Sequence, residues 1–286
     1  MKNCFSIFGI VLLILCNGCQ QKTVDFGNDV SFTIEKNIPY GKDSQQRMDI
    51  YFPEKRKREK DVFIIIHGGG WRGGNKSELT AFTHKLMEKF PENIFVNADY
   101  RLASTTHFAL PNQTDDIRYI TKYLDQTLSF KPRYILLGNS AGGNLSMLYA
   151  YQFDRDKNIK AVINIVGPAD LNDSGFKKYD DYSFLEKHLI DPAIVPKNIS
   201  LMDFGSPVHW VSKTSPPTLS FYGAYDDVVP LSQMKILDAA FVKHNVYHES
   251  YEFNGNHVSW INEPNSDFLI KKIHLFLMNI DKEKTP

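Results

Sequence analysis

The sequence is organised around Tyr134-Ile135-Leu136-Leu137-Gly138-Asn139-Ser140-Ala141-Gly142. Its first four residues are apolar and favour a buried strand, and the segment 143–153 is predicted to be a helix. A serine on a sharp strand-to-helix turn has its hydroxyl group above the edge of the sheet, and flanking glycines let the backbone pass without a Cβ clash. This geometry suits an acyl-transfer nucleophile, whereas the residue pattern alone would also fit a serine that simply begins a helix.

On both sides of this turn, near-continuous apolar strands alternate with amphipathic helices, a pattern typical of a parallel sheet covered on both faces. The strands 30–34 and 47–52 come first and are expected to run antiparallel. Further strands are predicted at 62–66, 94–96, 134–137, 161–166, 218–222 and 247–253, and helices at 79–90, 115–128, 144–153, 231–243 and 268–278. Segment 171–214 interrupts this alternation. We expect a cap or insertion above the carboxyl edge of the sheet, with a plain surface excursion as the alternative.

A glycine run follows the strand 62–66, in His67-Gly68-Gly69-Gly70-Trp71. Successive glycines leave backbone N–H groups unobstructed, so Gly69 and Gly70 are candidate donors to a developing oxyanion. The N–H of Ala141, directly after Ser140, would be the remaining donor. His67 is expected to hold the loop by hydrogen bonds rather than to act as a base.

The candidate acid and base follow the last two predicted strands. Asp226 and Asp227 are adjacent, and the spacing from Gly223 favours Asp226 as the carboxylate that orients a histidine. His257 lies in a Gly/Asn loop, and a histidine changes charge near neutral pH, which suits general-base work. The order Ser140, Asp226, His257 is the nucleophile, acid and base order of one fold.

Together these motifs resemble those of the α/β-hydrolases. Within that fold, they are similar to bacterial esterases of the hormone-sensitive-lipase-like group and to the bifunctional feruloyl/acetyl-xylan (BD-FAE-like) esterases. The resemblance rests on Arg47–Pro53, His67–Trp71, Asp99–Leu102, Pro111 with Asp115 and Asp116, Gly138–Gly142, Pro216–Thr218, Gly223–Pro230 and His257. The turn 103–106 lacks the proline and acidic residues common in the hormone-sensitive group, which favours the feruloyl/acetyl-xylan type.

The resemblance implies an α/β-hydrolase fold with a mostly parallel sheet, and hydrolysis of short-chain or carbohydrate-linked esters through an acyl-enzyme. Ser140, Asp226 and His257 would be the catalytic triad, and Gly69, Gly70 and Ala141 the oxyanion hole. Two other functions stay open. One is an amide hydrolase, either an arylformamidase or a peptidase-like enzyme. The other is a non-catalytic surface glycan-binding protein on a hydrolase scaffold.

Composition limits the partners. The chain has 286 residues, 42% of them hydrophobic, with 33 basic and 33 acidic side chains. A net charge near zero argues against nucleic acid, because phosphate binding needs a basic surplus. No His/Cys/Asp cluster has the spacing of metal ligands, so we expect neither a metal nor another cofactor.

All three cysteines, Cys4, Cys16 and Cys19, lie in the first nineteen residues. The apolar stretch 7–15 is too short to span a bilayer and suits a secretory signal peptide. Gly18-Cys19 after it resembles a bacterial lipoprotein processing site. We therefore expect a signal peptide over 1–18, a lipid on Cys19, a linker over 19–29 and a hydrolase domain over 30–286. This places the chain on the bacterial cell envelope, held at the membrane by its lipid anchor, with simple secretion as the alternative.

Overall fold

The central sheet is mostly parallel, as the sequence predicted. The computed structural model describes residues 22–54 and 61–282. Within these residues one nine-stranded sheet has the order β1-β2-β3-β5-β4-β6-β7-β8-β9. The strands are β1 Lys22–Asp25, β2 Ser31–Pro39, β3 Arg47–Pro53, β4 Val62–Ile66, β5 Ile94–Ala98, β6 Tyr134–Asn139, β7 Ile159–Ile165, β8 Thr218–Gly223 and β9 His248–Phe253. Strands β4 to β9 pair in parallel, whereas β1, β2 and β3 form an antiparallel extension that joins β5.

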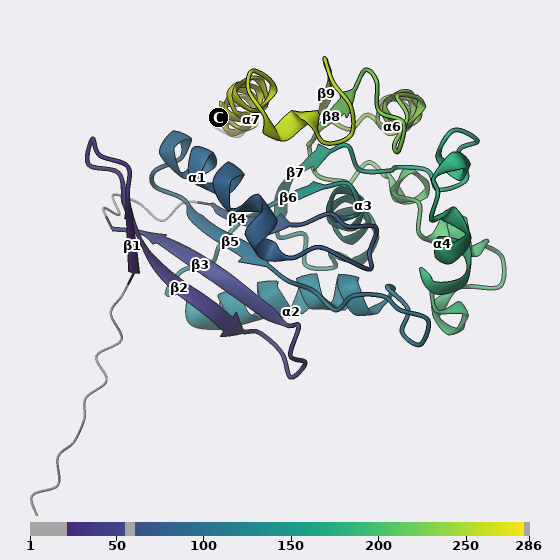
Figure 1. The fold of residues 1–286 in the computed structure, drawn as a ribbon, viewed down its shortest axis with the longest axis horizontal. Helices are drawn as coiled ribbons and strands as arrows, with labels where there is room; N and C mark the ends of the chain where they lie inside the picture. The colour runs from purple at the N-terminus through teal and green to yellow at the C-terminus, as the bar shows by residue number, and fades with distance from the viewer. Residues whose placement is uncertain (1–21, 55–60, 283–286) are drawn as a thin grey trace, which may run out of the picture.

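Helices cover both faces of this sheet. The helices are α1 Thr80–Lys89, α2 Asn112–Thr127, α3 Ala141–Leu148, α4 Tyr182–His188, α5 Leu201–Phe204, α6 Ser232–His244 and α7 Asn265–Lys282. Figure 1 shows α1 and α7 on one side of the sheet and α2 on the other. Together with the parallel strands, this is the α/β-hydrolase arrangement that the motifs led us to expect.

The hydrophobic core lies on both faces of β4, whose five residues are all buried. Alternate side chains of a strand point to opposite faces. Accordingly, Ile64 and Ile66 belong to the hydrophobic cluster under α2, α3 and α6, and Phe63 and Ile65 belong to the cluster under α1 and α7. A strand buried on both faces needs an uninterrupted apolar run, which is why 62–66 was recognisable from sequence.

Most predicted elements are present with bounds shifted by a few residues, and three segments show what the prediction did not specify. Lys22–Asp25, in the segment expected to be a linker, forms β1 and pairs antiparallel with β2. The helix predicted over 144–153 begins at Ala141, and its last residues, Tyr149–Phe153, form a π-helical turn. Segment 171–214 leaves the carboxyl end of β7 and contains α4, α5 and three 3-10 turns, Phe176–Lys178, Pro192–Ile194 and Pro207–Trp210.

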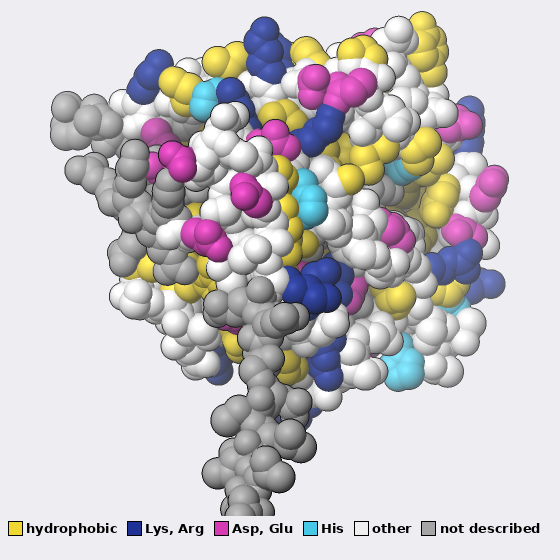
Figure 2. All heavy atoms as spheres, turned by 60° about the vertical axis from the view of Figure 1, so that its left-hand side comes forward, with side chains coloured by type: hydrophobic (Ala, Val, Ile, Leu, Met, Phe, Trp, Pro, Cys, Tyr) yellow, Lys and Arg dark blue, Asp and Glu magenta, His cyan; other side chains and the backbone are white. Residues whose placement is uncertain are grey.

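The charge of the surface and the described helices are relevant to the predictions about nucleic acid and membrane. Figure 2 shows basic and acidic side chains interspersed over one face of the molecule, in keeping with a formal net charge of zero. Among the described residues, no helix is both long enough and apolar enough to cross a membrane. The predicted signal peptide and Cys19 lie outside the described residues.

Candidate active site

Ser140 occupies a strained turn between β6 and α3. Its backbone has φ 51° and ψ −123°, a conformation that L-residues rarely adopt and that surrounding structure must enforce. Close packing around the flanking glycines enforces this conformation of Ser140. A Cβ on Gly138 would lie 2.2 Å from the carbonyl oxygen of Gly142, and a Cβ on Gly142 would lie 2.1 Å from that of Ile66. No residue with a side chain fits either position, so the glycines make the turn possible.

Three side chains that are distant in sequence meet at this turn. The Oγ of Ser140 lies 2.9 Å from Nε2 of His257, and Nδ1 of His257 lies 2.8 Å from Oδ2 of Asp226. An ionised carboxylate only accepts hydrogen bonds, so Nδ1–H donates to Asp226 and Nε2 is left to accept from the hydroxyl of Ser140. In this arrangement the serine hydroxyl faces a basic nitrogen, and the carboxylate would stabilise the protonated ring.

Asp226 is the aspartate that the loop after β8 turns inward. Its other oxygen, Oδ1, accepts hydrogen bonds from the N–H groups of Val228 and Val229 at 2.9 and 2.8 Å. Its side chain is fully buried, while that of His257 is 16% exposed. The neighbouring Asp227 is exposed, so it is not the aspartate that orients His257 in this structure.

The loop that holds the predicted oxyanion donors passes beside Ser140. A Cβ on Gly68 would lie 3.1 Å from the Cβ of Ser140, and Gly69 has a φ of +110°. The carbonyl oxygen of Gly69 accepts from the N–H groups of Arg72 and Gly73, which closes a turn. Ala141 is the first residue of α3, so its N–H has no partner four residues earlier within the helix. The backbone N–H groups of Gly69, Gly70 and Ala141 are therefore candidates to bind a negatively charged oxygen.

His67 packs beneath this loop. Its ring is buried and stacks on Tyr100 with a centroid distance of 4.2 Å. Burial lowers the pKa of His67, so the ring is neutral near pH 7 and its Nδ1–H donates to the carbonyl oxygen of Gly68, 2.7 Å away. The hydroxyl of Tyr100 donates to the carbonyl oxygen of His67 at 2.9 Å. The expected structural role of His67 matches these contacts.

Sequence reasoning missed Gln113, the second residue of α2. It is fully buried, and its Nε2 donates to the carbonyl oxygens of Trp71 and Arg101 at 2.6 and 2.8 Å. These bonds tie the end of the glycine loop to the helix that follows β5. The signal that could have found it is a polar residue on the buried face of an amphipathic helix, because such a group must have a partner.

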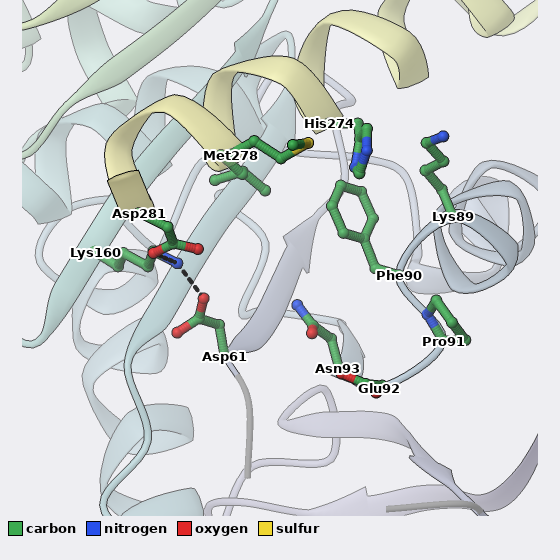
Figure 3. Close-up of a pocket in the computed structure, with 11 residues that line it drawn as sticks. Asp61, Lys89, Phe90, Pro91, Glu92, Asn93, Lys160, His274, Met278 and Asp281 are labelled. Carbon is green, nitrogen blue, oxygen red and sulfur yellow. Dashed lines mark hydrogen bonds and ion pairs between the residues drawn. The ribbon is translucent and has the colours of Figure 1, made fainter. Parts of the chain in front are cut away.

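A cavity of about 310 Å³ lies elsewhere, at the opposite edge of the sheet. Figure 3 shows it between α7 and the segment before β5, with Lys160 and Asp61 among its lining residues. Asp61 directly precedes β4, whereas Ser140 follows the carboxyl end of the parallel strand β6. This cavity is therefore separate from the candidate active site. Among the described residues, no group of three or more His, Cys, Asp or Glu side chains could hold a metal ion.

Comparison with known proteins supports the identification of the fold. Residues 48–241 match the BD-FAE family. The chain belongs to this family. Esterase LipC of Mycobacterium tuberculosis is 25% identical to this BD-FAE protein over 221 residues, which are 70% of this chain and 53% of the relative. The chain spans about half or less of the length of the curated relatives that it matches.

Solved structures agree on the fold of the BD-FAE protein. Esterase B of Lactobacillus rhamnosis superposes with a TM-score of 0.71 at 22% identity, covering 90% of this chain and 89% of its own. A truncated carbohydrate esterase from gut microbiota superposes with a TM-score of 0.69 at 18% identity, covering 89% and 98%. These structures confirm the predicted fold, and the family match confirms the predicted resemblance to the BD-FAE esterases.

Proposed function

We propose that this BD-FAE protein is a serine carboxylic-ester hydrolase that acts on short-chain or carbohydrate-linked acetyl or feruloyl esters. The observation that carries the proposal is the hydrogen-bonded series from Ser140 through His257 to Asp226. The family and the esterase relatives support ester hydrolysis. Support for a carbohydrate-linked ester comes from the gut-microbiota carbohydrate esterase that shares the fold.

In the first half of the proposed reaction, Oγ of Ser140 attacks the carbonyl carbon of the ester while Nε2 of His257 takes the hydroxyl proton. Asp226 stabilises the resulting imidazolium ring. The negative charge that forms on the carbonyl oxygen is held by N–H groups of Gly69, Gly70 and Ala141, and the loss of one such donor costs about 2.7–4 kcal/mol of transition-state stabilisation. His257 then gives its proton to the alcohol oxygen, the carbon–oxygen bond breaks, and the acyl group stays on Ser140.

In the second half, water attacks the acyl carbon and gives a proton to Nε2 of His257. The tetrahedral intermediate collapses, the bond to Oγ breaks, and His257 returns the proton to Ser140. The products are one alcohol and one carboxylic acid, and the enzyme is restored without a cofactor.

The test is Ser140→Ala, with the exposed Ser174→Ala as control. We expect Ser140→Ala to abolish hydrolysis of p-nitrophenyl acetate and labelling by a fluorophosphonate probe, with an unchanged melting temperature, while the control keeps both. Turnover by a correctly folded Ser140→Ala variant would remove Ser140 from this role. Ester hydrolysis is distinguished from amide hydrolysis by a panel of substrates: acetylated xylan, feruloyl esters, N-formylkynurenine and aminoacyl anilides. If the wild-type protein is not labelled by the fluorophosphonate probe, the result would favour a non-catalytic glycan-binding protein.

We further propose that the enzyme is lipid-anchored to the bacterial cell envelope through Cys19. Several acyl chains, at about 0.8 kcal/mol for each buried CH₂ group, would hold it at a membrane surface. Cys19→Ala should move the protein into the soluble fraction, whereas the matched variant Cys16→Ala should stay with the membranes. Continued membrane association of Cys19→Ala would exclude the anchor.

A further inference from the structure

The insertion between β7 and β8 places a phenol group over the glycine loop. A Cβ built on Gly70 would lie 2.9 Å from the hydroxyl oxygen of Tyr179. Because a carbon–carbon bond is about 1.5 Å long, this hydroxyl lies within about 4.5 Å of the Cα of Gly70. A side chain from the insertion therefore borders the same loop that supplies the proposed oxyanion donors.

Arg72 fastens the insertion to that loop. It follows Gly70 by two residues, and its Nη2 lies 2.6 Å from Oδ2 of Asp181, the residue before α4. Its guanidinium group also lies over the ring of Phe184, 4.7 Å from the centroid. Two contacts from one side chain thus fix the start of α4 against the turn after Gly70.

Further contacts within the insertion hold Tyr179. Its ring stacks on that of the buried Phe176 at a centroid distance of 5.8 Å. The hydroxyl of Tyr182 donates to the carbonyl oxygen of Leu171 at 2.9 Å, which secures the turn from inside. The phenol is consequently presented on a packed support rather than on a free loop.

The polar groups of this cluster remain open to solvent. The side chains of Arg72 and Asp181 are 43% and 37% exposed, and Tyr179 is half-buried. Burial and the charge of Asp181 raise the pKa of Tyr179, so its hydroxyl keeps its proton at neutral pH. The cluster therefore presents a neutral hydroxyl, which can both donate and accept a hydrogen bond, beside the loop and next to the ion pair of Arg72 and Asp181, and such a hydroxyl suits a hydroxyl-bearing ligand.

We propose that Tyr179, Arg72 and Asp181 form a polar subsite that binds hydroxyl groups of the ester substrate close to the bond that is cleaved. Tyr179 makes the direct contact, and Arg72 and Asp181 act as positioning residues. The subsite favours polyhydroxylated esters over alkyl or aryl esters with the same acyl group. This inference rests on the proposed ester hydrolysis.

The experiment compares two acetyl esters with wild-type enzyme and Tyr179→Phe, which removes one oxygen atom. One substrate is an acetylated methyl xyloside, and the other is p-nitrophenyl acetate, whose alcohol part has no hydroxyl group. A lost neutral hydrogen bond predicts a fall in kcat/KM of roughly threefold to tenfold for the xyloside, mainly through KM. The aryl ester should change by less than twofold, and Tyr123→Phe, a half-buried tyrosine on α2, should change neither substrate.

A second variant, Asp181→Asn, breaks the ion pair with Arg72 and should raise KM for the xyloside while leaving kcat unchanged. An equal loss with both esters would place the hydroxyl of Tyr179 in the chemistry shared by all acetyl esters and would overturn the subsite. No change with either ester in a folded Tyr179→Phe variant would reduce Tyr179 to packing and overturn it too. A wild-type enzyme inactive on both esters would instead refute the proposed function itself.

Discussion

Replacing Asp226 by asparagine isolates the electrostatic role of the buried carboxylate. The asparagine side-chain oxygen can occupy the Oδ1 position and still accept from the N–H groups of Val228 and Val229. An amide nitrogen then faces Nδ1 of His257 where Oδ2 stood. Because that nitrogen only donates, the ring must place its proton on Nε2, and Nε2 can no longer accept the proton of Ser140.

The expected loss follows from this change of tautomer. A wrong tautomer with intact geometry lowers kcat by about 10⁴-fold, which corresponds to roughly 5.5 kcal/mol of transition-state stabilisation. Stability should fall by less than about 1 kcal/mol, because both backbone hydrogen bonds survive. Asp226→Ala should lose activity and also about 2 kcal/mol or more of stability, since two amide groups then lack their acceptor.

The assay is hydrolysis of p-nitrophenyl acetate at pH 8, with thermal unfolding measured on the same samples. Asp227→Asn is the matched control, because the neighbouring aspartate is exposed, and it should keep wild-type activity. The reasoning is refuted if Asp226→Asn keeps more than a tenth of the wild-type kcat, or if Asp227→Asn loses activity to the same extent.

Three further predictions concern stability. Gly138→Ala puts a Cβ 2.2 Å from the carbonyl oxygen of Gly142, so circular dichroism should find the variant misfolded or several kcal/mol less stable; a melting temperature equal to that of wild type would contradict this. Lys160 is buried and paired with Asp61, so Lys160→Ala should cost about 3 kcal/mol in urea denaturation, and a cost under 1 kcal/mol would count against the pair. Burial lowers the pKa of His67 below its ordinary value of 6.5, so at acidic pH the unfolded chain binds a proton that the folded protein does not. The free energy of unfolding should therefore fall as the pH drops below 6.5, and it should fall less in the His67→Phe variant.

The sequence was most informative where one physical requirement dominates. The prediction of a strand over 62–66 agrees with β4 residue for residue, because a strand buried on both faces needs a continuous apolar run. The turn at Ser140 was recognisable because a Cβ atom on either flanking glycine would clash with a backbone oxygen, so only glycine fits there. In each case a single structural requirement determines which type of residue the position can hold.

Prediction was weaker where several residues act together. The spacing from Gly223 favoured Asp226, and the structure turns Asp226 inward, but the N–H groups of Val228 and Val229 that hold it there could not be predicted from the sequence. The mixed composition of the insertion has no single period, so neither its helices nor the approach of Tyr179 to Gly70 could be read from it. Such contacts depend on the tertiary path of two segments about 110 residues apart, which local preferences do not encode.

The meeting of His257 and Ser140 itself needs an explanation, because their strands are not neighbours. Strands β6 and β9 are separated by β7 and β8, so their ends lie roughly 14 Å apart at about 4.8 Å per step. The loop after β9 folds back across the end of β8, where a Cβ on Gly223 would lie 2.6 Å from the carbonyl oxygen of Gly255. The N–H of Tyr225 donates to that same oxygen at 3.0 Å and joins the aspartate loop to the histidine loop. A side chain at position 223 would clash with this oxygen and push the histidine loop away from Ser140, so Gly223 helps to set the distance on which the proposed proton transfer depends.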